Sequence, residues 1–366
     1  MHALKRFGTA FGGYKMMENY PVPECGPDDI ILEIKAAAIC GADMKHWGVD
    51  NGYDDTNITP DQQQSVRGHE FAGEIVKVGE NVKDWHIGQR VVSDNSAHVC
   101  GVCPACEQGD FLCCEHKVNL GLDNNTWGGG FSKYCKVPGE ILAIHKHAIW
   151  EIPEGIKYEE ACVLDPICNA YKAVAQQSHL IPGQDVVVFG TGPLGLFSVQ
   201  VAKLMGAVNI VMVGLDDDVK VRFGVAQELG ATHCVNGSKE DVVARCTEIC
   251  GRDNLGLVIE CSGANIALKQ AIEMTRPNAE IVRVGMGFKP LEFSINDITA
   301  WNKSIIGHMA YDSTSWRNCI RLLQSGQIKV QPMITHRLGL SQWQEGFDKM
   351  AKKEAIKVIF HYDYED

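Results

Sequence analysis

The sequence predicts an α/β protein with two domains: a β-barrel-like domain rich in short strands, then a doubly wound parallel sheet. Three observations support this prediction. The chain has 366 residues, which is enough for two domains with substantial cores. Closely spaced β-rich runs, broken by Gly, Pro and Asp, fill roughly the first 150 residues. From about residue 160, strand-like and helix-like segments alternate, which is typical of a parallel sheet covered by helices.

The predicted elements follow from these runs. In the first domain, strands are expected within 28–40, 71–82, 89–93, 133–139 and 141–145. In the second, strands are expected at 185–190, 209–213, 256–260 and 280–285, with helices at 193–206 and 219–230. The last apolar run, KVIFHY at 357–362, is expected to return to the first domain.

A glycine-rich turn joins the first strand and helix of the second domain. Gly190, Gly192 and Gly195 form G-x-G-x-x-G directly after a buried strand, and Pro193 and Leu194 open the helix. Such glycines let a pyrophosphate approach the helix N-terminus, where backbone N–H groups favour an anion. The context predicts a dinucleotide-binding turn.

Charge and cysteine content restrict the function. Lys plus Arg number 34 against 46 for Asp plus Glu, a formal charge of −12, and this argues against binding of nucleic acid or anionic membranes. No apolar run approaches the roughly 20 residues that span a bilayer, and the N-terminus lacks the apolar segment of a secretory signal. We therefore expect a cytoplasmic protein, in which the 15 cysteines are metal ligands or buried thiols rather than disulfides.

Five cysteines lie within the 15 residues of CGVCPACEQGDFLCC. Cys100, Cys103, Cys106 and Cys114 follow C-x2-C-x2-C-x7-C, and Cys113 is the spare. Short spacers of this kind converge four thiolates on one tetrahedral Zn²⁺. A site closed by four protein ligands has no position for a substrate, so this zinc is predicted to be structural.

A second group of candidate ligands is dispersed along the chain: Cys40 after an apolar run, His69 and Glu70 in RGHEFAG, and Asp165 at the start of a predicted helix. Each of these residues taken alone is unremarkable. However, GHEFAGEIVKVGENV matches G-H-E-x2-G-x5-G-x2-V throughout. Together with the cysteine loop and the glycine turn, it makes the chain resemble the medium-chain zinc-dependent dehydrogenases, in their sorbitol and threonine dehydrogenase branch.

The resemblance implies a fold and a chemistry. It implies a GroES-like catalytic domain at 1–158, completed by 299–366, a Rossmann coenzyme domain at 159–298, and assembly as a homotetramer or homodimer. Two zinc ions per chain are implied, one structural and one catalytic, the catalytic ion acting as a Lewis acid on the substrate alcohol.

The catalytic ligands are likewise implied by the resemblance. They are Cys40 and His69, with Glu70 as ligand or close neighbour and Asp165 as ligand directly or through water. The family usually carries Ser or Thr two residues after the catalytic Cys, to relay the substrate proton, but here that residue is Ala42.

Because alanine relays no proton, another route is needed. The sequence leaves Lys45, His46, a zinc-bound water and Glu70 as alternatives.

The end of the second strand bears on the coenzyme. Gly214 stands where NAD-using relatives usually carry an acid, and Asp216, Asp217 and Asp218 follow. These carboxylates can accept hydrogen bonds from ribose hydroxyls and repel a 2′-phosphate, which favours NAD.

The predicted reaction is the reversible NAD-linked oxidation of a secondary hydroxyl of a small-molecule polyol to a ketose. L-Threonine 3-dehydrogenase and dehydrogenation of a phosphorylated polyol are the alternative activities. A zinc-loop module that binds nucleic acid is a hypothesis of a different class, and the charge of −12 argues against it.

Overall fold

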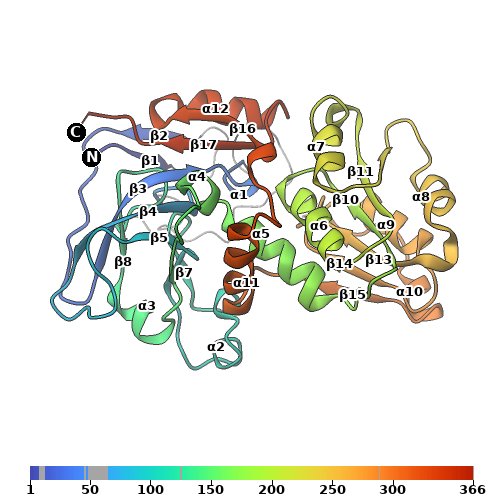
Figure 1. Cartoon of the computed structure of the whole chain (residues 1–366), viewed down its shortest axis with the longest axis horizontal. Coiled ribbons are helices and arrows are strands. Elements are labelled where there is room, and N and C mark those ends of the chain that lie inside the picture. The colour runs from blue at the N-terminus through green and yellow to red at the C-terminus, as the bar shows by residue number, and fades with distance from the viewer. Residues whose placement is uncertain (8–12, 45–46, 48–64, 124–125, 288, 366) are drawn as a thin grey trace. The chain divides into compact units, whose positions relative to one another are not determined.

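A computed structural model describes residues 1–7, 13–44, 47, 65–123, 126–287 and 289–365 (Figure 1). The chain forms two compact units, one of Met1–Asp165 with Ile334–Asp366 and the other of Pro166–Met333. No helix among these residues has the length and apolar character needed to cross a membrane.

The first unit is built on a sheet of mostly antiparallel strands. In the described part of the chain its order is β16-β17-β3-β4-β5-β9, and β8 pairs with β3 outside this path. The strands are β3 (Ile30–Ala38), β4 (Glu70–Val78), β5 (Arg90–Ser93), β8 (Tyr134–Val137), β9 (Ile149–Glu151), β16 (Ile334–Gly339) and β17 (Lys357–His361). Two smaller antiparallel pairs join β1 (Ala3–Arg6) to β2 (Tyr14–Met17) and β6 (Ser96–His98) to β7 (Val118–Asn119).

Short helices connect these strands. They are α1 (Gly41–Met44), α2 (Pro104–Glu107), α3 (Gly139–Ile144), α4 (Tyr158–Ala161) and α12 (Trp343–Ala351), with 3₁₀ turns η2 (Phe111–Cys113) and η7 (Leu340–Gln342). Helix α5 (Leu164–Tyr171) begins in the first unit and continues into the second. The prediction of a strand within 141–145 is wrong. Pro138 precedes a helical turn there, and Ile141 is the only residue of α3 that is buried, so the run lacks the alternating burial of a strand.

The second unit contains the predicted doubly wound sheet. Six strands in the described residues pair in parallel in the order β12-β11-β10-β13-β14-β15. They are β10 (Asp185–Phe189), β11 (Ile210–Gly214), β12 (His233–Asn236), β13 (Leu255–Glu260), β14 (Glu280–Arg283) and β15 (Ser304–Gly307). Every residue of β10, β11 and β13 is buried or nearly so, as expected for strands covered on both faces.

The helices of this unit lie around its sheet (Figure 1). They are α6 (Pro193–Leu204), α7 (Arg222–Leu229), α8 (Val242–Cys250), α9 (Asn265–Met274), α10 (Asn296–Ala300) and α11 (Ser313–Gln324), with a π-helical segment η3 (Lys172–Gln177) and 3₁₀ turns η4 (Asp216–Asp218), η5 (Arg252–Asn254) and η6 (Gln331–Met333). Helices α6 and α7 contact one another, as do α8 and α9, which matches one layer on each face of the sheet.

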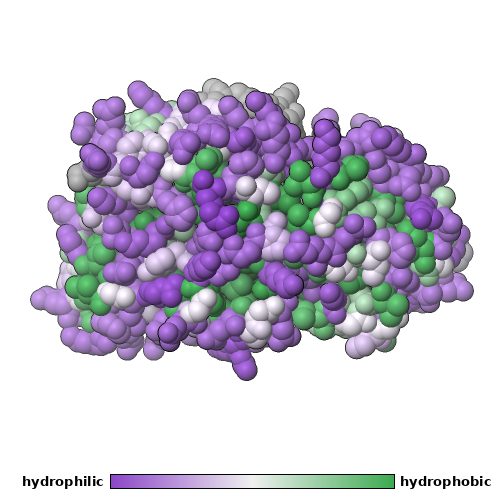
Figure 2. Space-filling view, turned by 45° about the horizontal axis from the view of Figure 1, so that its top comes forward, coloured by the Kyte–Doolittle hydropathy of each residue, from purple (hydrophilic) through white to green (hydrophobic). Residues whose placement is uncertain are grey.

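The compact units differ from the predicted domain boundaries in two segments: residues 159–165 belong to the first unit rather than to the coenzyme domain, and the second difference is larger. Residues 299–333 were predicted to complete the first domain, but they pack in the second unit because β15 extends the parallel sheet beside β14. The final strand does return to the first unit, where β17 pairs with β3. The surface shown in Figure 2 mixes hydrophilic and hydrophobic side chains, as protein surfaces ordinarily do.

Candidate metal and coenzyme sites

Two neighbouring strands bring the dispersed ligand candidates of the first unit together. Strands β3 and β4 are antiparallel, and their register places Ala38 opposite Glu70. Cys40 follows β3 by two residues, and His69 immediately precedes β4. Because the C-terminal end of one strand lies beside the N-terminal end of the other, motifs 29 residues apart in sequence (69 − 40) meet at one sheet end.

The geometry of this group suits a metal ion. One ligand atom from each of Cys40, His69 and Glu70 lies within 4.8 Å of the other two. Among the described residues, Nδ1 of His69 and Oε1 of Glu70 are buried without a hydrogen-bond partner. Leaving such an atom unsatisfied costs about 1–3 kcal/mol. A mixed S, N and O set of three ligands suits a zinc ion with an open position.

Burial controls the protonation of these ligands. Burial chiefly raises the pKa of the Glu70 carboxyl well above its usual range, and it also raises the pKa of the Cys40 thiol. The charge of Lys357 opposes both shifts, whereas Asp165 adds to both. A bound cation would reverse the balance, because it stabilises the thiolate and the carboxylate directly.

Lys357 is a site residue that the sequence analysis missed. It opens β17, its side chain is 1% exposed, and its ammonium group donates to Glu70 Oε2 and, at 3.0 Å, to the carbonyl oxygen of Ile39. A lysine beside the apolar run VIF was the available signal, since a charged side chain in a buried strand needs a partner. These two hydrogen bonds of the Lys357 ammonium group restrain Oε2 of Glu70 and the backbone at Ile39, just before Cys40.

Asp43 supports the same group from α1. Its Oδ2 accepts the backbone N–H of Cys40 at 3.0 Å, and its Oδ1 lies 3.8 Å from Nδ1 of His69 and 3.5 Å from the Arg67 guanidinium. The carboxylate is fully buried, so it restrains both the cysteine loop and the histidine ring.

The other predicted active-site residues do not belong to the group of Cys40, His69 and Glu70. Asp165 is outside the group within 4.8 Å, and its Oδ2 accepts a hydrogen bond from Nδ2 of Asn95 at 3.1 Å. Lys45 and His46 lie outside the described residues. Ala42 lies in α1, two residues after Cys40 and directly before Asp43 in the sequence.

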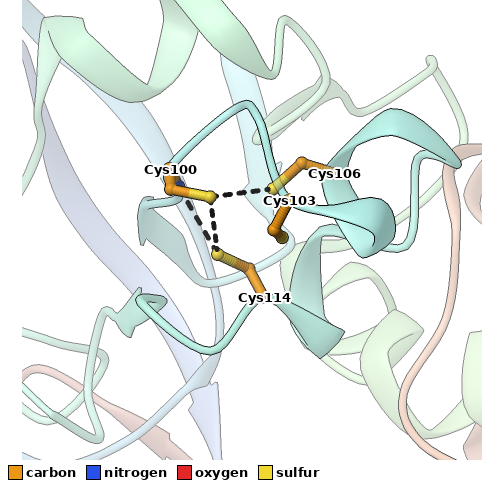
Figure 3. A group of neighbouring side chains, drawn as sticks. All are labelled: Cys100, Cys103, Cys106 and Cys114. Atoms are coloured by element: carbon orange, nitrogen blue, oxygen red, sulfur yellow. Dashed lines mark hydrogen bonds between the residues drawn. The ribbon is translucent and has the colours of Figure 1, made fainter.

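The four cysteines of the loop converge as predicted (Figure 3). Their sulfur atoms all lie within 4.8 Å of one another; Cys100 Sγ is 3.6 Å from that of Cys114 and 4.0 Å from that of Cys106. A tetrahedral zinc with bonds of about 2.3 Å requires sulfur–sulfur separations of about 3.8 Å. Cys113 is exposed and outside the group.

The loop favours a thiolate at Cys100, whereas burial chiefly raises the pKa of Cys106 to about 12. All 15 cysteines are free, as the sequence predicted. The backbone N–H of Val102 chiefly lowers the pKa of Cys100 to about 6, and the backbone N–H of Cys100 donates to Cys114 Sγ at 3.4 Å. N–H groups aimed at sulfur stabilise negative charge, which four ligands of one cation need.

The glycine turn of the second unit has the form of a pyrophosphate cradle. Gly190 follows β10 with φ 94°, and a Cβ atom on Gly195 would lie 1.8 Å from the carbonyl oxygen of Gly190. Gly192 is the N-cap of α6, and a Cβ atom there would meet no heavy atom within 4 Å. Pro193 and Leu194 begin the helix. The turn is therefore tight inside and open outside, as a phosphate site requires.

The acidic turn after β11 is more occupied than the sequence suggested. Asp216 accepts from Asn236 at 2.6 Å and pairs with Lys239 at 3.1 Å. Asp218 accepts the backbone N–H of Leu215 at 2.8 Å. Asp217 is exposed on the same turn.

Family models match most of the chain. The alcohol dehydrogenase GroES-like domain matches residues 26–147, and the zinc-binding dehydrogenase domain matches residues 193–325. The chain belongs to the zinc-dependent medium-chain alcohol dehydrogenase superfamily. It is therefore an oxidoreductase with a GroES-like domain and a Rossmann-type domain, as the resemblance implied.

Several relatives cover nearly the whole chain. The "uncharacterized zinc-type alcohol dehydrogenase-like protein YdjL" of Escherichia coli K12 is 77% identical over 100% of both chains. Sorbitol dehydrogenase of Halalkalibacterium halodurans is 29% identical over 98% of both. L-Threonine 3-dehydrogenase of Rhizobium rhizogenes is 32% identical over 94% of both.

Solved structures agree. 2R,3R-butanediol dehydrogenase from Bacillus subtilis superposes with a TM-score of 0.84 at 29% identity and 99% coverage of both chains. A protein assigned as a zinc-binding dehydrogenase from Sinorhizobium meliloti 1021, bound to NADP, has a TM-score of 0.82 at 26% identity and 98% coverage of both. The family model that matches residues 193–325 describes a zinc-binding dehydrogenase, and the Sinorhizobium structure contains NADP.

Proposed function

We propose that this chain reversibly oxidises a secondary hydroxyl of a polyol to the ketone, with NAD as the hydride acceptor. The convergence of Cys40, His69 and Glu70, whose ligand atoms lie within 4.8 Å of one another, carries the proposal. The similarity to sorbitol dehydrogenase supports a sugar alcohol as substrate class.

The catalytic metal would be held by Cys40, His69 and Glu70, with Asp165 beside them. Bound zinc supplies a Lewis acid that lowers the pKa of the substrate alcohol. Lys357 holds Oε2 of Glu70, and Asp43 holds the backbone of Cys40, so the ligand set is oriented by two buried charges. Hydrogen bonds of this kind hold the ligand side chains in the orientation that metal binding requires.

The substrate proton needs a carrier other than residue 42, because alanine has no hydroxyl. Glu70 is one candidate, because its carboxylate lies within 4.8 Å of the other two ligand candidates and can accept a proton. Lys45 and His46 remain the other candidates from the sequence, together with water. Substituting each in turn and recording the pH profile of kcat would separate them.

A second zinc would be held by Cys100, Cys103, Cys106 and Cys114. Four thiolates complete a tetrahedron, so this ion would have a structural function, and the chain would hold two zinc ions. Zinc content measured on the purified protein tests the number.

NAD is the coenzyme we propose over NADP. The turn after β11 carries three carboxylates, Asp216 to Asp218, of which Asp216 pairs with Lys239 and Asp218 with Arg222. Carboxylates at this strand end accept hydrogen bonds from ribose hydroxyls and disfavour a 2′-phosphate beside them. Asp217 is exposed on the same turn.

We further propose a homodimer, or a homotetramer built from it, in the cytoplasm. Strand β15 ends the sheet of the second unit, and Ile305 on it is 36% exposed, with Trp301 51% exposed and Met309 39% exposed beside it. A second copy adding its own β15 would pair the open edge and cover these side chains. Ile305→Pro should yield monomers in light scattering if this edge is the interface.

The fifteen free cysteines suit a reducing compartment, which supports the proposed location in the cytoplasm.

A substrate panel tests the reaction itself. Purified zinc-replete protein is mixed with NAD and sugar alcohols, phosphorylated sugar alcohols, simple secondary alcohols and L-threonine, and NADH is followed by its absorbance. The proposal expects the highest kcat/KM with a polyol. Activity confined to L-threonine would replace it by the second candidate, which the 32% identical threonine dehydrogenase favours.

A further inference from the structure

We propose that Asn95 is a positioning residue for Asp165, and that it connects the four-cysteine loop to the catalytic metal group. This inference rests on the proposed function, because it takes Asp165 to lie beside the catalytic zinc. The connection runs through residues that neither metal group contains.

Asn95 lies in the tight turn between β5 and β6. Its Nδ2 donates to Oδ2 of Asp165 at 3.1 Å, although 70 residues separate the two. Its φ is 61°, in the left-handed region that asparagine tolerates better than most residues. Its backbone N–H donates to Ser93 Oγ at 2.9 Å, and its carbonyl accepts from Leu120 at 2.7 Å. The backbone dihedral and two backbone hydrogen bonds therefore restrain the direction in which this amide points.

The preceding residue anchors the turn. Asp94 Oδ2 lies 2.5 Å from Nε2 of His145, and both side chains are only 5% exposed. Its Oδ1 accepts the backbone N–H of Ser96 at 2.9 Å, and its own N–H donates to the carbonyl of Ala148 at 3.0 Å. The buried contact between Asp94 and His145 and these two backbone hydrogen bonds hold the turn against the segment 145–148.

The cysteine loop packs on this anchor. Phe111 lies between Cys106 and Cys114 in sequence, and its ring centroid is 4.1 Å from that of His145. Strand β6 also leads from the turn directly toward Cys100. The loop that the four thiolates close thus touches the imidazole that holds Asp94, and Asp94 neighbours the amide that holds Asp165.

These contacts predict that binding of the catalytic zinc depends on Asn95 and on the cysteine loop, whereas binding of the four-thiolate zinc does not depend on Asn95. Disturbing Asn95 should weaken the catalytic zinc and spare the four-thiolate zinc. Disturbing the packing of Phe111 on His145 should weaken the catalytic zinc as well, although neither residue is near a catalytic ligand candidate in sequence. Outer residues that orient metal ligands typically change metal affinity by about 10–100-fold.

The test compares two variants of Asn95 with a matched control. Asn95→Gly removes the amide and keeps the left-handed backbone without strain, and Asn95→Asp keeps the shape but donates no hydrogen bond. Asn302→Gly is the control, because Asn302 also has positive φ, 50°, and its Nδ2 donates to Asn278 in an exposed part of the second unit. Zinc affinity is measured by chelator competition, and the catalytic position is also read from its Co²⁺ absorption spectrum.

Both Asn95 variants should release one zinc about tenfold more readily and shift the cobalt spectrum, with the second zinc and the melting temperature close to wild type. Phe111→Leu should weaken the same zinc. Wild-type affinity and spectrum in Asn95→Gly, or equal weakening in Asn302→Gly, would overturn the inference. Failure of the proposed function is distinguishable, because Cys40→Ser would then leave zinc content unchanged.

Discussion

Lys357→Met removes the cation beside Glu70 and leaves an apolar side chain of similar length in β17. Both side chains of the pair are 1% exposed, so the carboxyl left behind is cut off from water. Removing one partner of a buried pair typically costs about 3–5 kcal/mol. We expect a loss near the lower value, about 3 kcal/mol in the unfolding free energy of zinc-free protein, because Glu70 can take up a proton.

Urea denaturation at pH 7 measures this loss. For a compact unit of about 200 residues an m value of about 2 kcal/mol per molar is ordinary, so the midpoint should fall by about 1.5 M. Glu70→Gln combined with Lys357→Met should recover most of it, since no unpaired charge remains. Lys349→Met, which breaks only surface pairs with Glu345 and Glu354, should change stability by less than about 1 kcal/mol. A Lys357→Met midpoint equal to wild type, or a double variant as unstable as the single one, would refute the reasoning.

The other expected outcomes concern metals, coenzyme and protons. Cys40→Ser should keep the melting temperature, lose one zinc and lose activity by orders of magnitude. Cys103→Ser should first lower stability, because binding of zinc by four thiolates is part of the folding energy. Zinc content, melting temperature and turnover are measured for both variants, and the opposite pattern would exchange the two assignments. With the carboxylates at 216–218, kcat/KM with NAD should exceed that with NADP by at least about tenfold, or about 1.4 kcal/mol, and equal use of NADP would contradict the proposal. Ala42→Ser should leave kcat unchanged or modestly higher in a steady-state assay; a large loss would show that residue 42 must be small. Because the raised pKa of Glu70 makes the folded state bind more protons, stability of zinc-free protein should fall as pH rises above the ordinary value of 4.5, and Glu70→Gln should remove that part of the slope in urea titrations between pH 5 and 8; an unchanged slope would contradict this.

Local patterns were enough for much of the fold. The runs that became β3, β4, β10, β11 and β13 are long or strongly apolar, so burial and periodicity identify them without tertiary information. Strands β12 and β15 of the second unit were missed, and so were β1, β2, β6, β7, β9 and β16 of the first unit. Of these only β16 is longer than four residues, so most of them are too short to carry a strong pattern. The helix predicted at 219–230 begins at Arg222, because Asp218 accepts the backbone N–H of Leu215 and closes a separate 3₁₀ turn.

The ligand candidates were visible in the sequence because metal binding demands particular residue types at short spacings. C-x2-C-x2-C-x7-C brings its own members together through local turns, and G-x-G-x-x-G does so between one strand and one helix, so the motif alone implies proximity. What the sequence could not decide is which distant residue meets which ligand. Lys357 reaches Glu70 across 287 positions and Asn95 reaches Asp165 across 70, since strand pairing and a left-handed turn place them there. Neither partner has a short-range spacing to reveal it, because a buried charge or amide is satisfied by whatever the tertiary fold brings within about 3 Å.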